Sequence, residues 1–198
     1  PNADALAAFC SVYCERLGIP LTVRHVAVDA SSGQGLEAAA RDARYAAFAE
    51  CSGDSLLLAQ HRGDQAETVL FNLLRGTGVT GAAGMPVERR FGDLRLLRPM
   101  LGVSRAEIES YALAEGLAWV DDESNADTSL TRNFLRHEAL TAISQRFPAA
   151  EASLAQAASH FAEAASLLDE LAALDWQAVS DGDAARMPAL RQLSPARL

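Results

Sequence analysis

Residues 55–74 read SLLLAQHRGDQAETVLFNLL, and this stretch decides the fold class. Its first part, 55–59, is a short apolar run bounded by polar residues, which is typical of a strand buried on both faces of a parallel sheet. Residues 64–74 then follow a helical pattern. Because ligands of open α/β sheets bind where a strand ends, the polar residues between this strand and this helix are the first candidates for a functional site.

The segments before this stretch alternate between helix and strand. Apolar spacing predicts a helix over 3–17 that ends at Gly18. Alternating residues predict a strand over 21–28, and an alanine-rich stretch predicts a helix over 36–50 after a flexible loop at 31–35. The order helix, strand, helix, strand, helix predicts an α/β fold.

The segments after this stretch become helical towards the end of the chain. Ser104 and Glu107 form the predicted capping box of a helix that ends at Gly116. The other predicted elements are a glycine-rich loop, two short strands and two helices: 75–84, 94–97, 119–120, 132–147 and 149–179. A shift in composition at Pro148 predicts a domain boundary there.

Composition narrows the class of protein. The chain has 198 residues, of which 49% are hydrophobic, so it can bury a substantial core. No apolar run approaches the roughly 18 residues of a transmembrane helix, and the first residues lack the basic start of a signal peptide. The three cysteines (Cys10, Cys14 and Cys51) show no zinc-binding pattern. We therefore expect a cytoplasmic protein with reduced thiols and no membrane association.

Charge bears on whether the chain can contact nucleic acid. The net charge of −9 argues against such contact for the chain as a whole. The charge is unevenly spread, however. Acids and arginines nearly balance over 60–146, so this region could carry a local positive patch. All 17 basic residues are arginine, so phosphate contacts fall to the planar guanidinium group.

Four polar stretches are candidates for chemistry. The first is in the helix at 36–50, where pairs of residues spaced four apart share one face: Glu37, Arg41, Arg44 and Tyr45. A surface ion pair explains them equally well.

The third candidate stretch is 75–78. Its glycines, Gly76 and Gly78, lie beside Arg75 and would let backbone N–H groups approach an anion. The alternative for this third stretch is a helix C-cap at Gly76.

The second candidate stretch, 60–68, follows the strand at 55–59. His61 and Asp64 lie where a ligand would bind, while a capping box from Asp64 to Glu67 explains the same residues without a ligand.

The fourth candidate stretch is the acidic segment 121–127 followed by a helix. Its acidic spacing does not fit a calcium-binding EF-hand loop. Arg132 and Arg136, with Asn133 between them, lie on one helix face and could contact phosphates, or they could be an ordinary solvated face.

These stretches resemble one family when they are taken together and in order. They are GLEAAARDARY at 35–45, LLLAQHRGDQAETVLFNLLRGTGVTGAAGMP at 56–86, RPMLGVSRAEIESYA at 98–112 and WVDDESNADTSLTRNFLRH at 119–137. The sequence resembles the tRNA(Ile)-lysidine synthases, a family of PP-loop ATP pyrophosphatases, over about residues 1–175.

The resemblance implies a fold and a reaction. The fold would be an α/β, parallel-sheet PP-loop domain, Rossmann-like and of the adenine nucleotide alpha hydrolase type, followed by a helical segment. The enzyme would be a ligase that uses ATP and Mg²⁺ to adenylate C2 of the wobble cytidine of tRNA(Ile) with a CAU anticodon. Free L-lysine would then displace AMP to form lysidine. The oligomeric state stays open, a homodimer included.

The resemblance also implies roles for residues. Asp64, Arg41 and Arg132 would be catalytic, and the metal ligands are unknown. Residues expected to bind ATP or substrate are Glu37, Arg44, His61, Arg75, Gly76 and Gly78. The tRNA would be contacted by Arg132, Asn133 and Arg136, because developing charge on phosphate is stabilised by arginine.

Two departures from the family pattern bear on activity. Gln60 and Gly63 stand where the family has a histidine and an aspartate. The Ser-Gly-Gly-x-Asp-Ser loop that cradles ATP is absent. The expected organisation is therefore a PP-loop domain at 1–147 lacking its first strand and P-loop. Residues 148–198 would then be a helical linker and the start of a substrate-binding domain. We expect this chain alone not to turn over ATP.

Three alternatives remain open from the sequence. A related PP-loop enzyme that thiolates tRNA would need Cys-x-x-Cys pairs, which Cys10, Cys14 and Cys51 do not supply. A non-catalytic tRNA-binding fragment would bind tRNA in a salt-dependent way without forming AMP. A plain α/β domain would carry arginines that are merely solvated.

Overall fold

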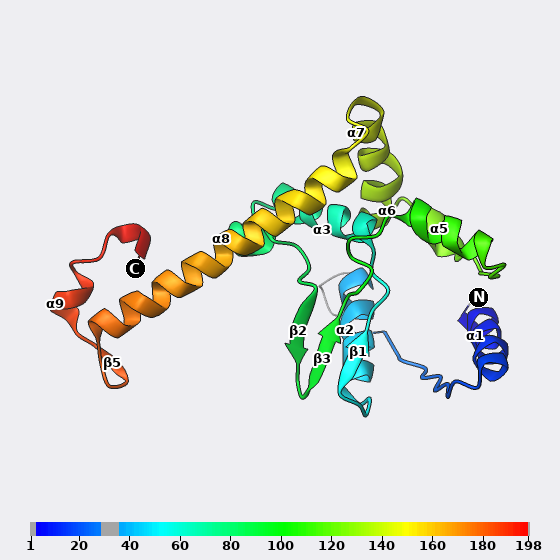
Figure 1. Cartoon of the computed structure of the whole chain (residues 1–198), viewed down its shortest axis with the longest axis horizontal. Coiled ribbons are helices and arrows are strands. Elements are labelled where there is room, and N and C mark those ends of the chain that lie inside the picture. Colours follow the sequence, from blue (N-terminus) through cyan, green and yellow to red (C-terminus); the bar gives the residue numbers. More distant parts are fainter. Residues whose placement is uncertain (1–2, 29–35, 198) are drawn as a thin grey trace.

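A computed structural model of the chain describes residues 3–28 and 36–197, and Figure 1 shows their arrangement. The N-terminal part holds α1 (Ala3–Leu17), α2 (Leu36–Ala49), β1 (Ser55–Leu57), α3 (Arg62–Leu74) and α4 (Val79–Ala82). The middle holds β2 (Glu88–Phe91), β3 (Leu94–Leu97), α5 (Arg105–Ala114), η1 (Glu123–Ala126), α6 (Thr131–Phe134), the π-helix η2 (Leu135–Ala139) and α7 (Leu140–Arg146). The rest holds α8 (Ala150–Val179), β4 (Ser180–Asp181), β5 (Ala184–Ala185), α9 (Met187–Leu190) and η3 (Pro195–Arg197).

The sheet that positions the site has the strand order β1-β3-β2. β1 runs parallel to β3, with Ser55 opposite Arg95, and β2 runs antiparallel to β3. The tight turn between β2 and β3 uses Gly92 at φ +59°, a backbone conformation that side chains other than glycine rarely adopt. The predicted α/β class is confirmed, and β1 and β3 supply its parallel pair; the antiparallel β2 makes the small sheet mixed. β2 was not predicted, because its sequence Glu-Arg-Arg-Phe carries too little apolar character to stand out.

Two strand predictions fail for one physical reason, which is that a strand needs a hydrogen-bonded neighbour. Residues 21–28 alternate as predicted but pair with no described strand, and the side chain of Val23 stays 46% exposed. Residues 119–120 also lie outside any described strand. The predicted strand at 55–59 is present as β1, but Leu57 is 64% exposed, so the prediction that this strand is buried on both faces is wrong. The predicted loop at 31–35 lies outside the described residues.

The helix predictions hold closely. The capping box of Ser104 and Glu107 is present and opens α5, and Gly116 follows its end at φ +62°. The predicted helix over 132–147 is α6, η2 and α7 in succession, and it ends before Pro148. The predicted helix over 149–179 is α8, which runs across α3 and α4 (Figure 1). No helix in the described part of the chain is both long and apolar enough to span a membrane.

Polar side chains of α3 hold the glycine-rich segment that follows it. Gln65, only 6% exposed, donates to the carbonyl of Met85 (3.0 Å) and accepts from its amide (2.8 Å). Asn72 donates to the carbonyl of Gly81 at 2.7 Å. Gly84, at φ +66°, leaves no space for a side chain, because a Cβ there would lie 2.8 Å from Oε1 of Gln65. The loop is therefore fixed by α3.

The end of α3 is closed by Gly76, as the C-cap alternative predicts. Gly76 has φ +73°, its amide donates to the carbonyl of Leu73 at 3.0 Å, and the amide of Thr77 donates to Asn72 at 3.2 Å. This pair of bonds is the Schellman motif that ends many helices.

Replacing Gln65 with leucine tests the contact between α3 and the loop. We expect Gln65→Leu to lower the free energy of unfolding by about 2 kcal/mol, because it leaves the half-buried amide and carbonyl of Met85 without their side-chain partner. Urea denaturation measures the change. The matched control is Gln145→Leu on the exposed face of α7, expected to change stability by less than about 0.5 kcal/mol. Equal losses in the two variants would contradict this account.

Candidate functional site

The candidate site begins where β1 ends and α3 starts. His61 is the N-cap of α3, and its Nδ1 accepts a hydrogen bond from the amide of Gly63 at 3.0 Å. Asp64 completes the capping box, since its Oδ2 accepts from the amide of His61 at 2.9 Å. A capping box is therefore present, but it joins His61 to Asp64. The predicted box from Asp64 to Glu67 is wrong, because the helix starts two residues earlier than expected and leaves Glu67 inside it.

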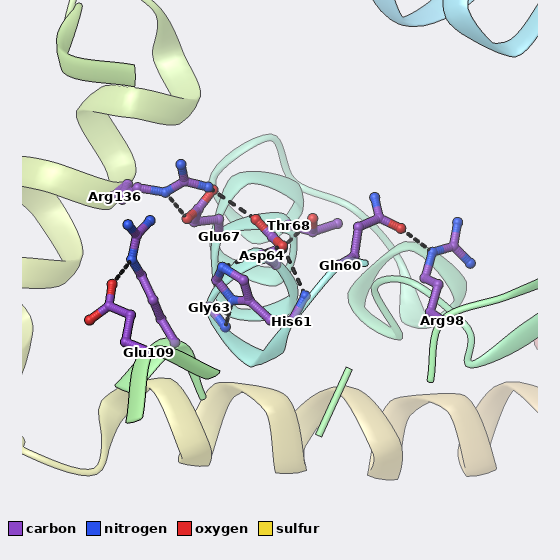
Figure 2. A network of polar contacts seen from close by, with 10 residues as sticks. Gln60, His61, Gly63, Asp64, Glu67, Thr68, Arg98, Glu109 and Arg136 are labelled. Carbon is purple, nitrogen blue, oxygen red and sulfur yellow. Dashed lines mark hydrogen bonds and ion pairs between the residues drawn. The ribbon is translucent and has the colours of Figure 1, made fainter. Parts of the chain in front are cut away.

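Glu67 is instead the buried centre of an ion-pair network, shown in Figure 2. It is 2% exposed, and it accepts from Nε of Arg136 at 2.6 Å and from Nη2 at 3.1 Å. The same Nη2 donates to Oδ1 of Asp64 at 3.0 Å. One guanidinium group thus bridges two carboxylates that lie one turn apart on α3, and it joins segments about 70 residues apart in the sequence.

The pKa values in this network follow from burial and charge. Burial raises the pKa of Glu67 above its ordinary value, with a smaller contribution from the charge of Asp64, and both outweigh the lowering effect of Arg136. Burial alone would lower the pKa of Arg136, but contact with Glu67 and the charge of Asp64 outweigh it and raise the pKa. The guanidinium group therefore stays charged, and Glu67 depends on it to remain ionised.

Arg136 reaches these carboxylates from a π-helical turn. The turn Leu135–Ala139 interrupts the helix between α6 and α7, and Leu135 in it is 2% exposed. A π turn inserts an extra residue and changes the direction of the following side chains, and such turns are frequent at functional sites. No pattern in the sequence indicated it.

Asn133 and His137 hold the acidic segment against this helix. The side-chain amide of Asn133 donates to the carbonyls of Ser124 (2.9 Å) and Asp127 (3.0 Å). Nε2 of His137 lies 2.7 Å from the carbonyl of Asn125. Both amide hydrogens of Asn133, a residue predicted to contact tRNA, are thus used to position the loop.

The other predicted residues divide into two groups. The first lies on α2 and α6 and consists of Glu37, Arg41, Arg44 and Arg132. Glu37 of α2 is brought to Arg132 of α6, with Oε1 2.9 Å from Nε, and the charge of Arg132 also acts on Glu67. Arg41 lies one helical turn beyond Glu37, with its guanidinium carbon 5.5 Å from the ring centre of Tyr45, and Arg44 is exposed.

Arg75, Gly76 and Gly78 form the second group, at the opposite end of α3. A helix rises about 1.5 Å per residue, so they lie roughly 20 Å from the cap of His61. Arg75 lies over the ring of Phe71, 5.1 Å from its centre, and Gly78 is the N-cap of the short α4. The structure brings Glu37, His61, Asp64, Arg132, Asn133 and Arg136 to one region and leaves these three residues apart from it.

Sequence reasoning missed Arg98 and gave no role to Gln60. Gln60 follows the carboxyl end of β1, Arg98 follows β3, and Oε1 of Gln60 accepts from Nε of Arg98 at 2.5 Å (Figure 2). Arg98 is 3% exposed. The signal that could have found it is its position directly after the apolar run 94–97, since the ends of parallel strands meet at one edge.

The carboxylates of Asp64 and Glu67 do not fit the magnesium ion that the resemblance implies. Asp64 is occupied by Arg136 and the amide of His61, and Glu67 is occupied by Arg136. Over residues 3–28 and 36–197, no cluster of three or more His, Cys, Asp or Glu side chains could hold a metal ion.

The chain is similar to known proteins over nearly its whole length. The profile of the PP-loop domain matches residues 1–143. Proteins named tRNA(Ile)-lysidine synthase are 51% identical in Pseudomonas fluorescens (87% of this chain, 39% of the relative) and 47% identical in Pseudomonas putida (98% and 48%). A protein of that name in Alkalilimnicola ehrlichii is 46% identical (100% and 45%). The chain therefore spans less than half the length of these curated relatives.

Replacing Arg136 tests the ion-pair network and its pH dependence. We expect Arg136→Gln to lower the free energy of unfolding by about 3 kcal/mol near neutral pH, because Glu67 is left buried without a cation. A carboxyl group whose pKa is raised by folding binds protons more readily in the folded state, so the stability it contributes falls as pH rises through that window. Without Arg136 the pKa of Glu67 rises further, so the loss should be larger at about pH 8 than at about pH 5.

Urea denaturation of both proteins at the two pH values measures this difference. The matched control is Arg132→Gln, whose ion pair with Glu37 is about 40% exposed and should contribute less than about 1 kcal/mol. Its pH dependence should be smaller than that of Arg136→Gln, because the charge of Arg132 acts on Glu67 more weakly than that of Arg136 does. A loss for Arg136→Gln that is equal at both pH values, or no larger than that of the control, would contradict the account.

Proposed function

The chain belongs to the PP-loop domain family, and from this membership we propose that it carries part of the active site of a tRNA(Ile)-lysidine synthase. Such an enzyme would transfer AMP from ATP to the oxygen on C2 of the wobble cytidine in a CAU anticodon, and pyrophosphate would leave as the bond between the α- and β-phosphates breaks. Lysine would then attack that carbon through an amine, AMP would leave, and a carbon–nitrogen bond would form. The substrates would be ATP, free L-lysine and tRNA(Ile), and the enzyme would work in the cytoplasm, where tRNA is used.

The observation that carries the proposal is the pair of carboxylates at the start of α3. Asp64 and Glu67 lie at the end of a strand, where ligands of α/β sheets bind, and they already hold a cation, the guanidinium group of Arg136. The ammonium group of a free amino acid offers the same kind of N–H donors. We propose that these carboxylates orient the lysine substrate, with Arg136 as the cation that occupies the site in its absence.

Arginines of the neighbouring helices suit the first step of the reaction. Adenylation concentrates negative charge on the phosphates of ATP, and fixed cations stabilise that charge in the transition state. Arg132, held by Glu37, and Arg41 on the same helix as Glu37 are proposed for this role. The magnesium ion is not assigned to residues of this chain, since no group of three or more His, Cys, Asp or Glu side chains among the described residues could hold a metal ion.

The positions of the cysteines among the described residues do not favour the thiolating alternative. Cys10 and Cys14 lie on α1 and Cys51 follows α2, and none of the three belongs to the polar network at α3. A site for tRNA thiolation would place cysteines beside the reacting nucleotide.

A chimeric enzyme tests the proposal without depending on how much of the protein these residues represent. The segment of the Pseudomonas fluorescens relative that this chain matches would be replaced by the chain, and incorporation of labelled lysine into a tRNA with a CAU anticodon would be measured. We expect lysine to be incorporated, and Asp64→Asn to reduce kcat/KM for lysine at least about tenfold, as expected for a lost charge-assisted contact.

The control for this experiment is Glu109→Gln, which removes an exposed ion pair with Arg105 on α5 and should leave the rate unchanged. A folded chimera that incorporates no lysine would refute the assignment. An unchanged rate in Asp64→Asn would refute the role of that carboxylate.

A further inference from the structure

Three arginines gather around one tyrosine next to the site just described. The guanidinium carbons of Arg41 and Arg89 lie 5.5 Å and 5.4 Å from the ring centre of Tyr45. The charge of Arg98, at the end of β3, also acts on the Tyr45 phenol. The three arginines come from α2, from β2 and from the end of β3, which are separate parts of the sequence that the fold brings together.

No carboxylate among the described residues forms an ion pair with these arginines. The ion pairs within 4.0 Å among the described residues involve other arginines, and none includes Arg41, Arg89 or Arg98. The partners of Arg98 are neutral, namely the side-chain oxygen of Gln60 and the carbonyl of Pro86 at 2.8 Å. The Nε of Arg89 is buried and has no hydrogen-bond partner in the described part of the chain.

Burying unpaired positive charges is unfavourable, and the pKa values reflect it. Burial lowers the pKa of Arg98, the contact with Tyr45 opposes this, and the like charges of Arg89 and Arg41 lower it further. Burial alone would raise the pKa of Tyr45, but contacts with Arg89 and Arg98 outweigh it and lower the pKa. Buried charges in proteins are normally paired, so this cluster of arginines lacks the anion that would pair with it.

The position of the cluster is that of a ligand site. Gln60 and Arg98 follow the carboxyl ends of two neighbouring parallel strands, β1 and β3, and the amide of Leu58 continues the ladder by donating to the carbonyl of Leu97 at 2.9 Å. Ligands of open α/β sheets bind at this edge. Planar guanidinium groups suit oxygens of phosphate in particular, because each can donate two parallel hydrogen bonds.

From this geometry we infer that Arg41, Arg89 and Arg98, together with Tyr45, form a binding site for a phosphate group. Arg41 was already expected near phosphate from the resemblance; Arg89, Arg98 and Tyr45 are assigned by the structure alone. The inference rests on the proposed function only for the source of the phosphate. ATP and the RNA backbone both carry this group, and the experiment separates them.

Binding of inorganic pyrophosphate to the 198-residue chain tests the inference without any catalytic step. Titration calorimetry would compare the unmodified chain with Arg41→Gln and Arg89→Gln. Each substitution should weaken pyrophosphate binding about tenfold, because a charge-assisted hydrogen bond is lost. Arg41 is exposed and Arg89 half-buried, so both variants should fold, which circular dichroism verifies.

The matched control is Arg90→Gln, which removes the same charge from the neighbouring residue of β2. Side chains of successive strand residues point to opposite faces, so Arg90 points away from the cluster and its loss should leave affinity unchanged. No pyrophosphate binding by the folded chain, unchanged affinity in both Arg41→Gln and Arg89→Gln, or an equal loss in Arg90→Gln would overturn the inference.

A second titration identifies the source of the phosphate. Arginine-dependent binding of ATP but not of an RNA stem-loop with a CAU anticodon would assign the site to the nucleotide, and the reverse result would assign it to RNA. Because no lysine transfer is measured, a failure of the proposed function would leave these results intact, and a failure of the phosphate site would leave the chimera experiment intact.

Discussion

The contact of Arg136 with Glu67 and Asp64 is the constraint on which the site depends. It fixes the segment from α6 to α7 against the first turns of α3, although the residues involved lie far apart in the sequence. Once that segment is fixed, Arg132 can pair with Glu37 of α2, and Asn133 can hold the acidic loop through two carbonyls. Without the arginine, a buried carboxylate would lie beside a second one with no counter-charge, a costly arrangement.

Two kinds of arginine site adjoin at the edge of the sheet. Arg136 is neutralised by two carboxylates, whereas Arg41, Arg89 and Arg98 have no carboxylate partner among the described residues. The consecutive residues Gln60 and His61 connect these sites, since Gln60 contacts Arg98 and His61 caps the helix that carries Asp64 (Figure 2). The proposed ammonium site and the proposed phosphate site are therefore linked through consecutive residues, as the proposed reaction between an amine and an adenylated base would require.

Sequence patterns predicted the helices, strands and caps that depend on residues close together in the chain. The strand and helix at 55–74, the short strand at 94–97, the capping box at Ser104 and the closure of α3 at Gly76 all depend on residues a few positions apart. The strand predicted over 21–28 failed because pairing depends on a distant partner. β2 was missed because its polar residues are placed by pairing with β3.

The candidate site could be predicted in part. Residues at a strand end or on a helix face, such as Asp64 and Arg136, were found from spacing, but the contact between them was not, because about 70 residues separate them. Arg89 and Arg98 were missed for a similar reason: each looks like an ordinary charged residue until the fold places it beside Tyr45. His61 was expected as a ligand and not as a cap, since histidine is uncommon at that position.

The central claim is that Arg136 and the carboxylates of α3 act as one unit, and a double-mutant cycle tests it most directly. The cycle would compare Arg136→Gln, Glu67→Gln and the double variant by urea denaturation at neutral pH. The account predicts a coupling energy of about 2 kcal/mol, so the double variant should be clearly more stable than the sum of the single losses implies. Losses that add to within about 0.3 kcal/mol would show that the two residues act independently and would contradict the account.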